Sequence, residues 1–191
     1  MIILSIDVGI RNLAYILLKV NEVNKHEILQ WDVLELIEPD EKAAKSDNTK
    51  IGKSLCIQLD SVLEGKEIDK ILIENQIGQN AIKMKSIQGM INMYFIMRDY
   101  DIQNIINYNA IHKLKCFIGN TKTTYNERKK KSKEITQCLC KYYYGDDMYQ
   151  YYCSYKKKDD LADCLLQALD YIRREKFLND SFYEPIYNEM S

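Results

Sequence analysis

The chain has 191 residues, of which 46% are hydrophobic and 29% are charged, and its formal net charge is −1. This length and composition predict one globular domain with a substantial core. No apolar run has membrane-spanning length and no basic segment precedes the first apolar run, so we expect neither a membrane segment nor a secretory signal. Six cysteines without a C-x-x-C pair, and only two histidines, disfavour a zinc site and indicate an intracellular protein with reduced thiols.

Charge is unevenly distributed along the chain. Residues 109–158 contain 12 Lys and Arg against 4 Asp and Glu, a net of +8, which leaves −9 for the remainder. This segregation predicts that one face of the protein meets a polyanion. A lysine-rich surface that is merely solvated is the alternative.

Short apolar runs predict the strands. Residues 2–8 read IILSIDV, a run typical of a strand buried on both faces. Gly9 then turns the chain into a second run over 13–20, and a third over 26–34 completes an antiparallel meander. Two further short buried strands are expected over 71–73 and 102–106.

Apolar residues at helical spacing predict the helices. The predicted helices cover residues 51–63, 81–100, 110–117, 128–144 and about 156–174. The tyrosine-rich stretch 145–155 is expected to be a mobile connection, and 175–191 a weakly structured tail outside a domain of residues 1–174. The order predicts an α/β fold: a mixed five-stranded sheet, three strands antiparallel plus two parallel, flanked by helices.

Four carboxylates lie at strand ends or on one helix face, positions from which they could form a functional site. Asp7 and Glu74 end two buried strands, and Asp160 and Asp163 lie three residues apart on one helix face. Taken singly, such acids can cap a turn or complement a helix dipole. Ligands of α/β sheets gather at the carboxyl ends of strands, and clustered carboxylates need cations. The set therefore predicts hard divalent metals and two-metal phosphodiester chemistry.

Three motifs carry a resemblance to a known family. They are DVGIRNLAY at residues 7–15, LIEN at 72–75 and KKDDLADCLLQALDY at 157–171. In this order they resemble the Holliday junction resolvases of the RNase H-like superfamily, the poxvirus resolvases above all, with bacterial RuvC as a relative. The resemblance implies an RNase H-like fold and a homodimer that resolves four-way DNA junctions by paired symmetric nicks. It also implies two Mg²⁺ ions per active site, replaceable by Mn²⁺, and a role in viral concatemer resolution and recombination in the host cytoplasm.

The resemblance also implies site residues. By motif, the metal-binding catalytic acids fall on Asp7, Glu74, Asp160 and Asp163, and the family's catalytic lysine falls on Lys115. Contacts to branched DNA are expected from basic side chains, namely Arg11, Lys122, Arg128, Lys129, Lys130, Lys131, Lys133, Lys156, Lys157 and Lys158. The tyrosines of residues 142–155 are expected mainly to pack, although tyrosines can also stack on unpaired bases.

Two alternatives stay open for function: a nuclease for RNA–DNA hybrids with the same acids, and a non-catalytic nucleic-acid-binding module of the same fold. An apolar stripe on the helix over residues 81–100 suggests the dimer interface. It consists of Met90, Met93 and Met97, which have no obvious partner within the chain. The alternative is that the tail beyond Arg174 covers these methionines.

Overall fold

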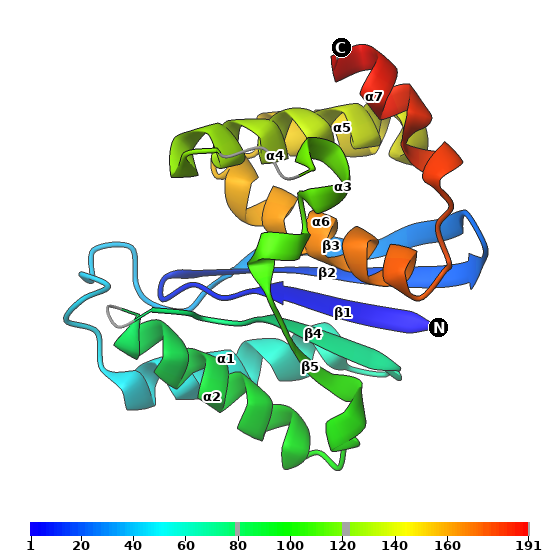
Figure 1. Ribbon diagram of the computed structural model, residues 1–191. Helices are drawn as coiled ribbons and strands as arrows, with labels where there is room; N and C mark the ends of the chain where they lie inside the picture. Colours follow the sequence, from blue (N-terminus) through cyan, green and yellow to red (C-terminus); the bar gives the residue numbers. More distant parts are fainter. Residues whose placement is uncertain (79–80, 120–122, 191) are drawn as a thin grey trace.

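The computed structural model describes residues 1–78, 81–119 and 123–190. Its centre is a mixed five-stranded sheet with the strand order β3-β2-β1-β4-β5 (Figure 1). The antiparallel meander is β1 (Ile2–Asp7), β2 (Asn12–Glu22) and β3 (Lys25–Glu35), and the parallel strands are β4 (Lys70–Glu74) and β5 (Ile105–Tyr108). The predicted mixed sheet is confirmed.

Helices cover both faces of the sheet (Figure 1). One face carries α1 (Asn48–Leu63) and α2 (Ile82–Ile96). The other carries α4 (Tyr125–Leu139), α5 (Gly145–Ser154), α6 (Lys158–Arg174) and α7 (Glu184–Met190). The short α3 (Lys115–Ile118) follows the sheet and precedes α4. Within the residues described, no helix is both long and apolar enough to cross a bilayer.

Side chains of β1 alternate between two cores. Leu4 and Ile6 pack against α1 and α2, whereas Ile3 belongs to the core beneath α6. This double burial explains why the strand reads as a continuous apolar run. Because successive side chains of a strand point to opposite faces, Asp7 has the same orientation as Ile3 and Ser5 and faces α6.

Buried polar contacts fix the position of α6 on the sheet. The Ser5 hydroxyl donates to the carbonyl of Cys164 at 2.8 Å, and Gln167 Nε2 donates to Ser5 Oγ at 3.0 Å. The Trp31 indole donates to the carbonyl of Leu161 at 3.1 Å. Buried hydrogen bonds of this kind specify one packing arrangement, which here sets the height of α6 against the end of β1.

Residues 145–154 form a helix, so the prediction that residues 145–155 are a mobile connection is wrong. A π-helical turn, η3 (Cys140–Tyr144), leads directly into α5. Tyr152 is fully buried and stacks on Trp31 with ring centroids 5.5 Å apart, and the Tyr151 hydroxyl donates to the Trp31 carbonyl at 2.8 Å. These tyrosines bury their rings and satisfy their hydroxyls, as the packing interpretation expects.

The C-terminal segment is also structured, contrary to the expectation of a weakly structured tail. It forms a 3-10 turn, η4 (Asp180–Tyr183), and then α7. Phe182, Tyr183 and Ile186 are buried in the core on the α6 side of the sheet. The segment therefore lies on the opposite face from α2 (Figure 1) and does not cover its methionines.

Two further predicted elements differ in extent. The predicted strand over residues 102–106 begins later, because a 3-10 turn, η1 (Ile102–Asn104), precedes β5. The predicted helix over residues 110–117 is interrupted between another 3-10 turn, η2 (Ala110–His112), and α3. The interruption contains Lys113 and Leu114, and Lys113 is part of the site described below.

Candidate active site

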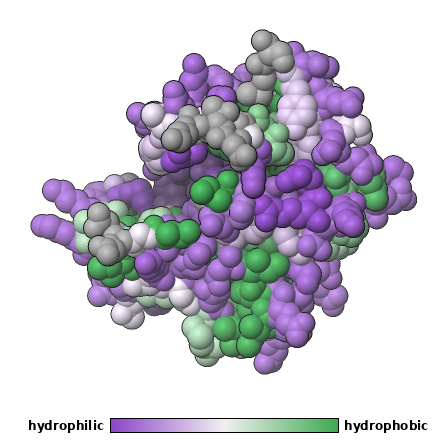
Figure 2. Space-filling view, in the orientation of Figure 1, coloured by the Kyte–Doolittle hydropathy of each residue, from purple (hydrophilic) through white to green (hydrophobic). Residues whose placement is uncertain are grey.

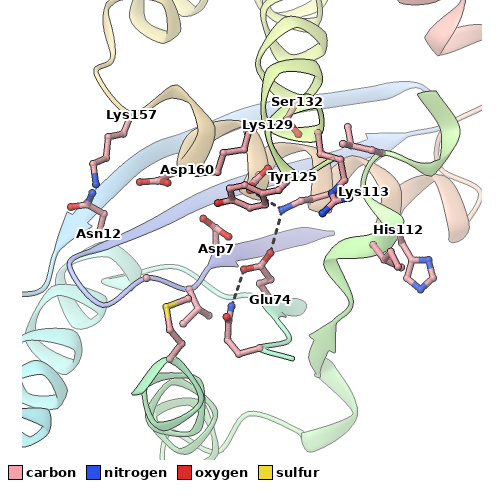
Figure 3. Close-up of a pocket in the computed structure, with 18 of the residues that line it drawn as sticks. Asp7, Asn12, Glu74, His112, Lys113, Tyr125, Lys129, Ser132, Lys157 and Asp160 are labelled. Atoms are coloured by element: carbon pink, nitrogen blue, oxygen red, sulfur yellow. Dashed lines mark hydrogen bonds and ion pairs between the residues drawn. The ribbon is translucent and has the colours of Figure 1, made fainter. Parts of the chain in front are cut away.

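Three carboxylates meet where β1, β4 and α6 come together. Asp7 ends β1 and Glu74 ends β4, and the parallel pairing of these strands brings both acids to one edge of the sheet (Figure 3). Asp163 reaches the same point from α6. One oxygen from each of the three carboxylates lies within 4.8 Å of the other two. This separation suits hard divalent cations, which take oxygen ligands.

The turn after β1 requires glycine. A Cβ atom on Gly9 would lie 1.9 Å from the carbonyl oxygen of Asn12. This steric clash excludes any residue with a side chain at this position. The tight turn lets the chain leave Asp7 at the tip of β1 and return as β2 beside it. The D-x-G pattern of the sequence is thus a local requirement of the turn that leaves the acid at the tip of β1.

A lysine lies among the acids. Lys113 Nζ is 2.9 Å from Asp163 Oδ2 and 3.2 Å from Glu74 Oε1, and the Lys113 side chain is only 10% exposed. Lys115, the residue predicted for this place, is exposed at the start of α3. The structure thus places Lys113, and not Lys115, among the acids, because the chain from β5 runs past the acids before α3 begins.

Burial and charge shift the pKa values of these groups in different directions. Burial raises the pKa of Asp7 well above its ordinary value, and the nearby charges of Glu74 and Asp163 raise it further. Burial, partly offset by Lys113, also raises the pKa of Asp163. Burial opposes ionisation of Glu74 as well, but Lys113 and hydrogen bonds with Asp7 and Gln76 outweigh it, so its pKa is lowered. A bound cation would favour ionisation of all three acids.

The fourth predicted acid, Asp160, lies outside this group of three. It faces the cleft beside Asn12 and Lys157 (Figure 3). Burial and the charge of Asp159 raise its pKa, while Lys157 and a hydrogen bond from Asn12 act in the opposite direction. Asp160 is therefore placed at the margin of the three-carboxylate cluster, one helical turn before Asp163.

The acids lie in a cleft of about 1250 Å³. A hydrophilic hollow is visible in Figure 2 between the α2 side and the α4 side of the molecule. Basic side chains that line the cleft are Arg11, Lys113, Lys115, Arg128, Lys129 and Lys157. The cleft thus combines acids from β1, β4 and α6 with a wall of positive charge from α4.

Comparison with known proteins identifies the family. The model described as "Poxvirus A22 protein" matches residues 1–175 of this chain. The chain belongs to this family. It is also 31% identical over 120 residues to protein L451 of Acanthamoeba polyphaga mimivirus, an alignment that covers 55% of this chain and 29% of L451. The chain thus spans less than a third of the length of that relative.

Two solved structures share the fold. The fowlpox virus resolvase, solved with substrate Holliday junction DNA, is 22% identical with a TM-score of 0.61 over 92% of this chain and 99% of that one. Thermus thermophilus RuvC, solved with a Holliday junction substrate, is 17% identical with a TM-score of 0.60 over 92% and 97%. The RNase H-like fold implied by the sequence motifs is confirmed.

The predicted DNA contacts fall into distinct groups in this Poxvirus A22 family member. Arg128, Lys129 and Lys157 line the cleft. Lys129 also pairs with Asp159, at 2.5 Å. The remaining lysines of α4 and of the start of α6 are not among the residues that line the cleft: Lys130, Lys131, Lys133, Lys156 and Lys158. Lys122 lies outside the described residues.

Arg11, predicted to contact DNA, is hydrogen-bonded to the backbone of a neighbouring loop. Its guanidinium donates to the carbonyl oxygens of Glu38 at 2.8 Å, Pro39 at 3.1 Å and Glu41 through a short bond. The fork of guanidinium donors suits several carbonyls at once. Arg11 therefore anchors the loop that follows β3, although it also borders the cleft.

Two polar residues that sequence reasoning did not select support the acids. Gln76 Nε2 donates to Glu74 Oε2 at 2.8 Å, and Asn12 hydrogen-bonds Asp160. Gln76 lies two residues after Glu74, and Asn12 lies within DVGIRNLAY. Their positions in or directly after the quoted motifs are a sequence signal for a role in the site. An amide side chain alone, however, does not indicate which carboxylate it contacts.

Proposed function

We propose that this protein is a structure-selective endodeoxyribonuclease that resolves four-way DNA junctions by paired symmetric nicks. The observation that carries the proposal is the three-carboxylate cluster with Lys113 at the base of a basic-walled cleft. Family membership supports it, as does the fold shared with two resolvases solved with junction DNA. The proposed setting is viral concatemer resolution and recombination in the host cytoplasm.

Asp7, Glu74 and Asp163 would hold a divalent cation, and their carboxylate oxygens fit such an ion because they are hard donors within 4.8 Å of one another. Asp160, at the margin, would contribute to a second ion. We propose Mg²⁺ for both, with Mn²⁺ able to substitute. Two ions bound there would supply an activated water and stabilisation of the leaving 3′-oxygen.

The chain's own groups would position the substrate and balance its charge. The Lys113 ammonium, held by Glu74 and Asp163, is placed to neutralise a phosphate that enters the cluster. Gln76 would keep Glu74 oriented through its 2.8 Å hydrogen bond. Arg128 and Lys157, which line the cleft, would contact the DNA backbone, since such contacts set the register of the substrate without reading its sequence.

A homodimer would supply two active sites for two nicks, because a four-way junction has two-fold symmetry. We propose α2 as the interface. Met93 is 51% exposed and Met97 is 76% exposed, and Ile82 and Ile96 extend the apolar surface of the helix. Met90, the third methionine of the predicted stripe, is partly buried against the core under α1 and would contribute less.

The test is cleavage of a synthetic four-way junction with and without Mg²⁺, beside a linear duplex and an RNA–DNA hybrid of matched sequence. The proposal expects metal-dependent paired nicks in the junction alone, and none with the Asp7→Asn variant. Preferential cleavage of the hybrid would favour an RNase H-type nuclease. Junction binding without cleavage at any Mg²⁺ or Mn²⁺ concentration would favour a non-catalytic binding module.

A further inference from the structure

A second buried ionic group lies on α6, away from the three-carboxylate cluster. The Asp170 side chain is fully buried, and its carboxylate pairs with Arg173 Nη2 at 3.1 Å and Arg174 Nε at 3.0 Å. The hydroxyl of Tyr108 donates a short hydrogen bond to Asp170 Oδ2. A buried carboxylate is costly unless it is paired and hydrogen-bonded, and this one has three donors.

Tyr108 connects this group to the strand that carries Glu74. Tyr108 is the last residue of β5 and is 6% exposed. It is the parallel partner of Glu74, and its carbonyl accepts a 2.7 Å hydrogen bond from the amide of Asn75. The Arg174 guanidinium lies 5.6 Å from the centre of its ring. The backbone of Tyr108 is thus fixed to β4, and its side chain is fixed to α6.

The segment from Tyr108 to Lys113 is attached to α6 at both ends. Asp163 and Asp170 are seven residues apart, about two helical turns, so they lie on the same face of α6. Asp170 binds Tyr108 at the start of the segment, and Asp163 binds Lys113 at its end. The turn η2 lies between these points, and its His112 ring contacts Tyr108 edge-on at 6.3 Å.

We propose that Tyr108 and Asp170 are positioning residues that set where the Lys113 ammonium lies relative to the acids. This inference rests on the catalytic role proposed above for Lys113. Lys113 belongs to no helix or strand, so a regular hydrogen-bond ladder does not fix its backbone. The contact of Tyr108 with Asp170 supplies the missing constraint, five residues before Lys113.

The first test removes a single hydroxyl. Tyr108→Phe is expected to lower kcat for junction cleavage about tenfold, the effect of removing one hydrogen bond to a charged group, with KM unchanged. Tyr171→Phe is the matched control, because Tyr171 is a 7% exposed tyrosine of α6 whose ring lies 6.4 Å from that of Tyr108. Asp170→Asn is the second variant. Equal kcat values for both Tyr→Phe variants would overturn the proposal.

A double-mutant cycle separates positioning from general destabilisation. If Tyr108 acts through Lys113, then Tyr108→Phe added to Lys113→Met should lower activity no further than Lys113→Met alone. If the fold losses of activity of the two single variants multiply in the double variant, Tyr108 supports the fold rather than the position of the lysine. This result would contradict the proposal.

A third readout does not depend on cleavage. Reductive methylation followed by mass spectrometry measures the reactivity of each lysine, and exposed Lys115 serves as the internal reference for Lys113. The Lys113 rate relative to Lys115 should rise in Tyr108→Phe and stay unchanged in Tyr171→Phe. This result would stand even if the wild-type protein cleaved no junction, which would refute the proposed function alone. An unchanged Lys113 rate in both Tyr108→Phe and Asp170→Asn would refute the positioning role.

Discussion

The Lys113 ammonium and the Asp163 carboxylate form an ion pair of 2.9 Å at the base of the cleft. The two residues come from different elements, since Lys113 precedes α3 and Asp163 lies in the second turn of α6. Glu74 shares the same ammonium at 3.2 Å. The buried Lys113 ammonium therefore interacts with a cluster of carboxylates. The pKa of Lys113 is raised because the negative charges of these carboxylates outweigh the effect of burial.

This ion pair predicts different consequences for two nearby lysines. Lys113→Met should reduce the rate of junction cleavage at least about a hundredfold, the typical cost of losing a group that stabilises transition-state charge. Lys115→Met, two residues on, should retain most of the activity because its side chain is exposed on α3. Single-turnover cleavage at saturating protein measures both. A larger reduction for Lys115→Met than for Lys113→Met would instead favour Lys115, the lysine predicted from the sequence, as the catalytic one.

Neutralising Asp7 should abolish cleavage but stabilise the fold in EDTA. Burial and two neighbouring carboxylates raise the pKa of Asp7, so ionisation costs more in the folded chain than in the unfolded chain. This cost is absent below the unfolded pKa, grows as pH rises from the unfolded to the folded pKa, and stays constant above it. Asp7→Asn should therefore raise Tm relative to wild type more at pH 7 than at pH 4. Thermal denaturation at both pH values checks this, and a lower Tm at pH 7 would contradict the electrostatic description.

The basic wall of the cleft predicts the salt dependence of DNA binding. The double variant Arg128→Gln with Lys157→Gln should weaken binding to any DNA and lower the slope of log affinity against log salt by about 0.9 for each phosphate that is no longer neutralised. Lys53→Gln is the control, because Lys53 is exposed on α1 at the opposite face of the sheet. Titrations over a range of salt concentrations measure the slope. The same slope in all three proteins would mean that the wall is only a solvated surface.

The apolar surface of α2 predicts the oligomeric state. Met93→Arg should yield a monomer that binds DNA but loses paired cleavage, because a charge at a buried interface lacks a partner. Val23→Arg, at the turn between β2 and β3, is the matched control, since Val23 is 50% exposed and Met93 is 51% exposed. Sedimentation at micromolar concentration distinguishes dimer from monomer. A monomeric wild-type protein, both free and on the junction, would exclude this interface.

Much of the fold could be predicted because local patterns and tertiary structure agree. The run Ile2–Asp7 is apolar almost throughout since both faces of β1 are buried, and the apolar face of α6 marks the side that packs on the sheet. The convergence of Asp7 and Glu74 followed from parallel strands ending at one edge, and Asp163 joins them from α6. These features depend on periodicity and topology, which the sequence encodes directly.

Other features depend on contacts between distant segments, and local patterns do not encode these. The stretch Gly145–Ser154 has few aliphatic residues, but its tyrosines are ordered by Trp31 on β3, more than a hundred residues earlier. The choice between Lys113 and Lys115 depends on where α3 begins. Arg11 could not be assigned to the carbonyls of the loop after β3 from sequence, because the path of that loop was unknown.

Single-turnover cleavage of a synthetic four-way junction in Mg²⁺ tests the central claim most directly, with a linear duplex of the same arms as the control. The account predicts two symmetric nicks in the junction, none in the duplex, and disappearance of both nicks when EDTA is added or Asp7 is replaced by Asn. Equal cleavage of junction and duplex, or cleavage that survives in Asp7→Asn, would contradict it.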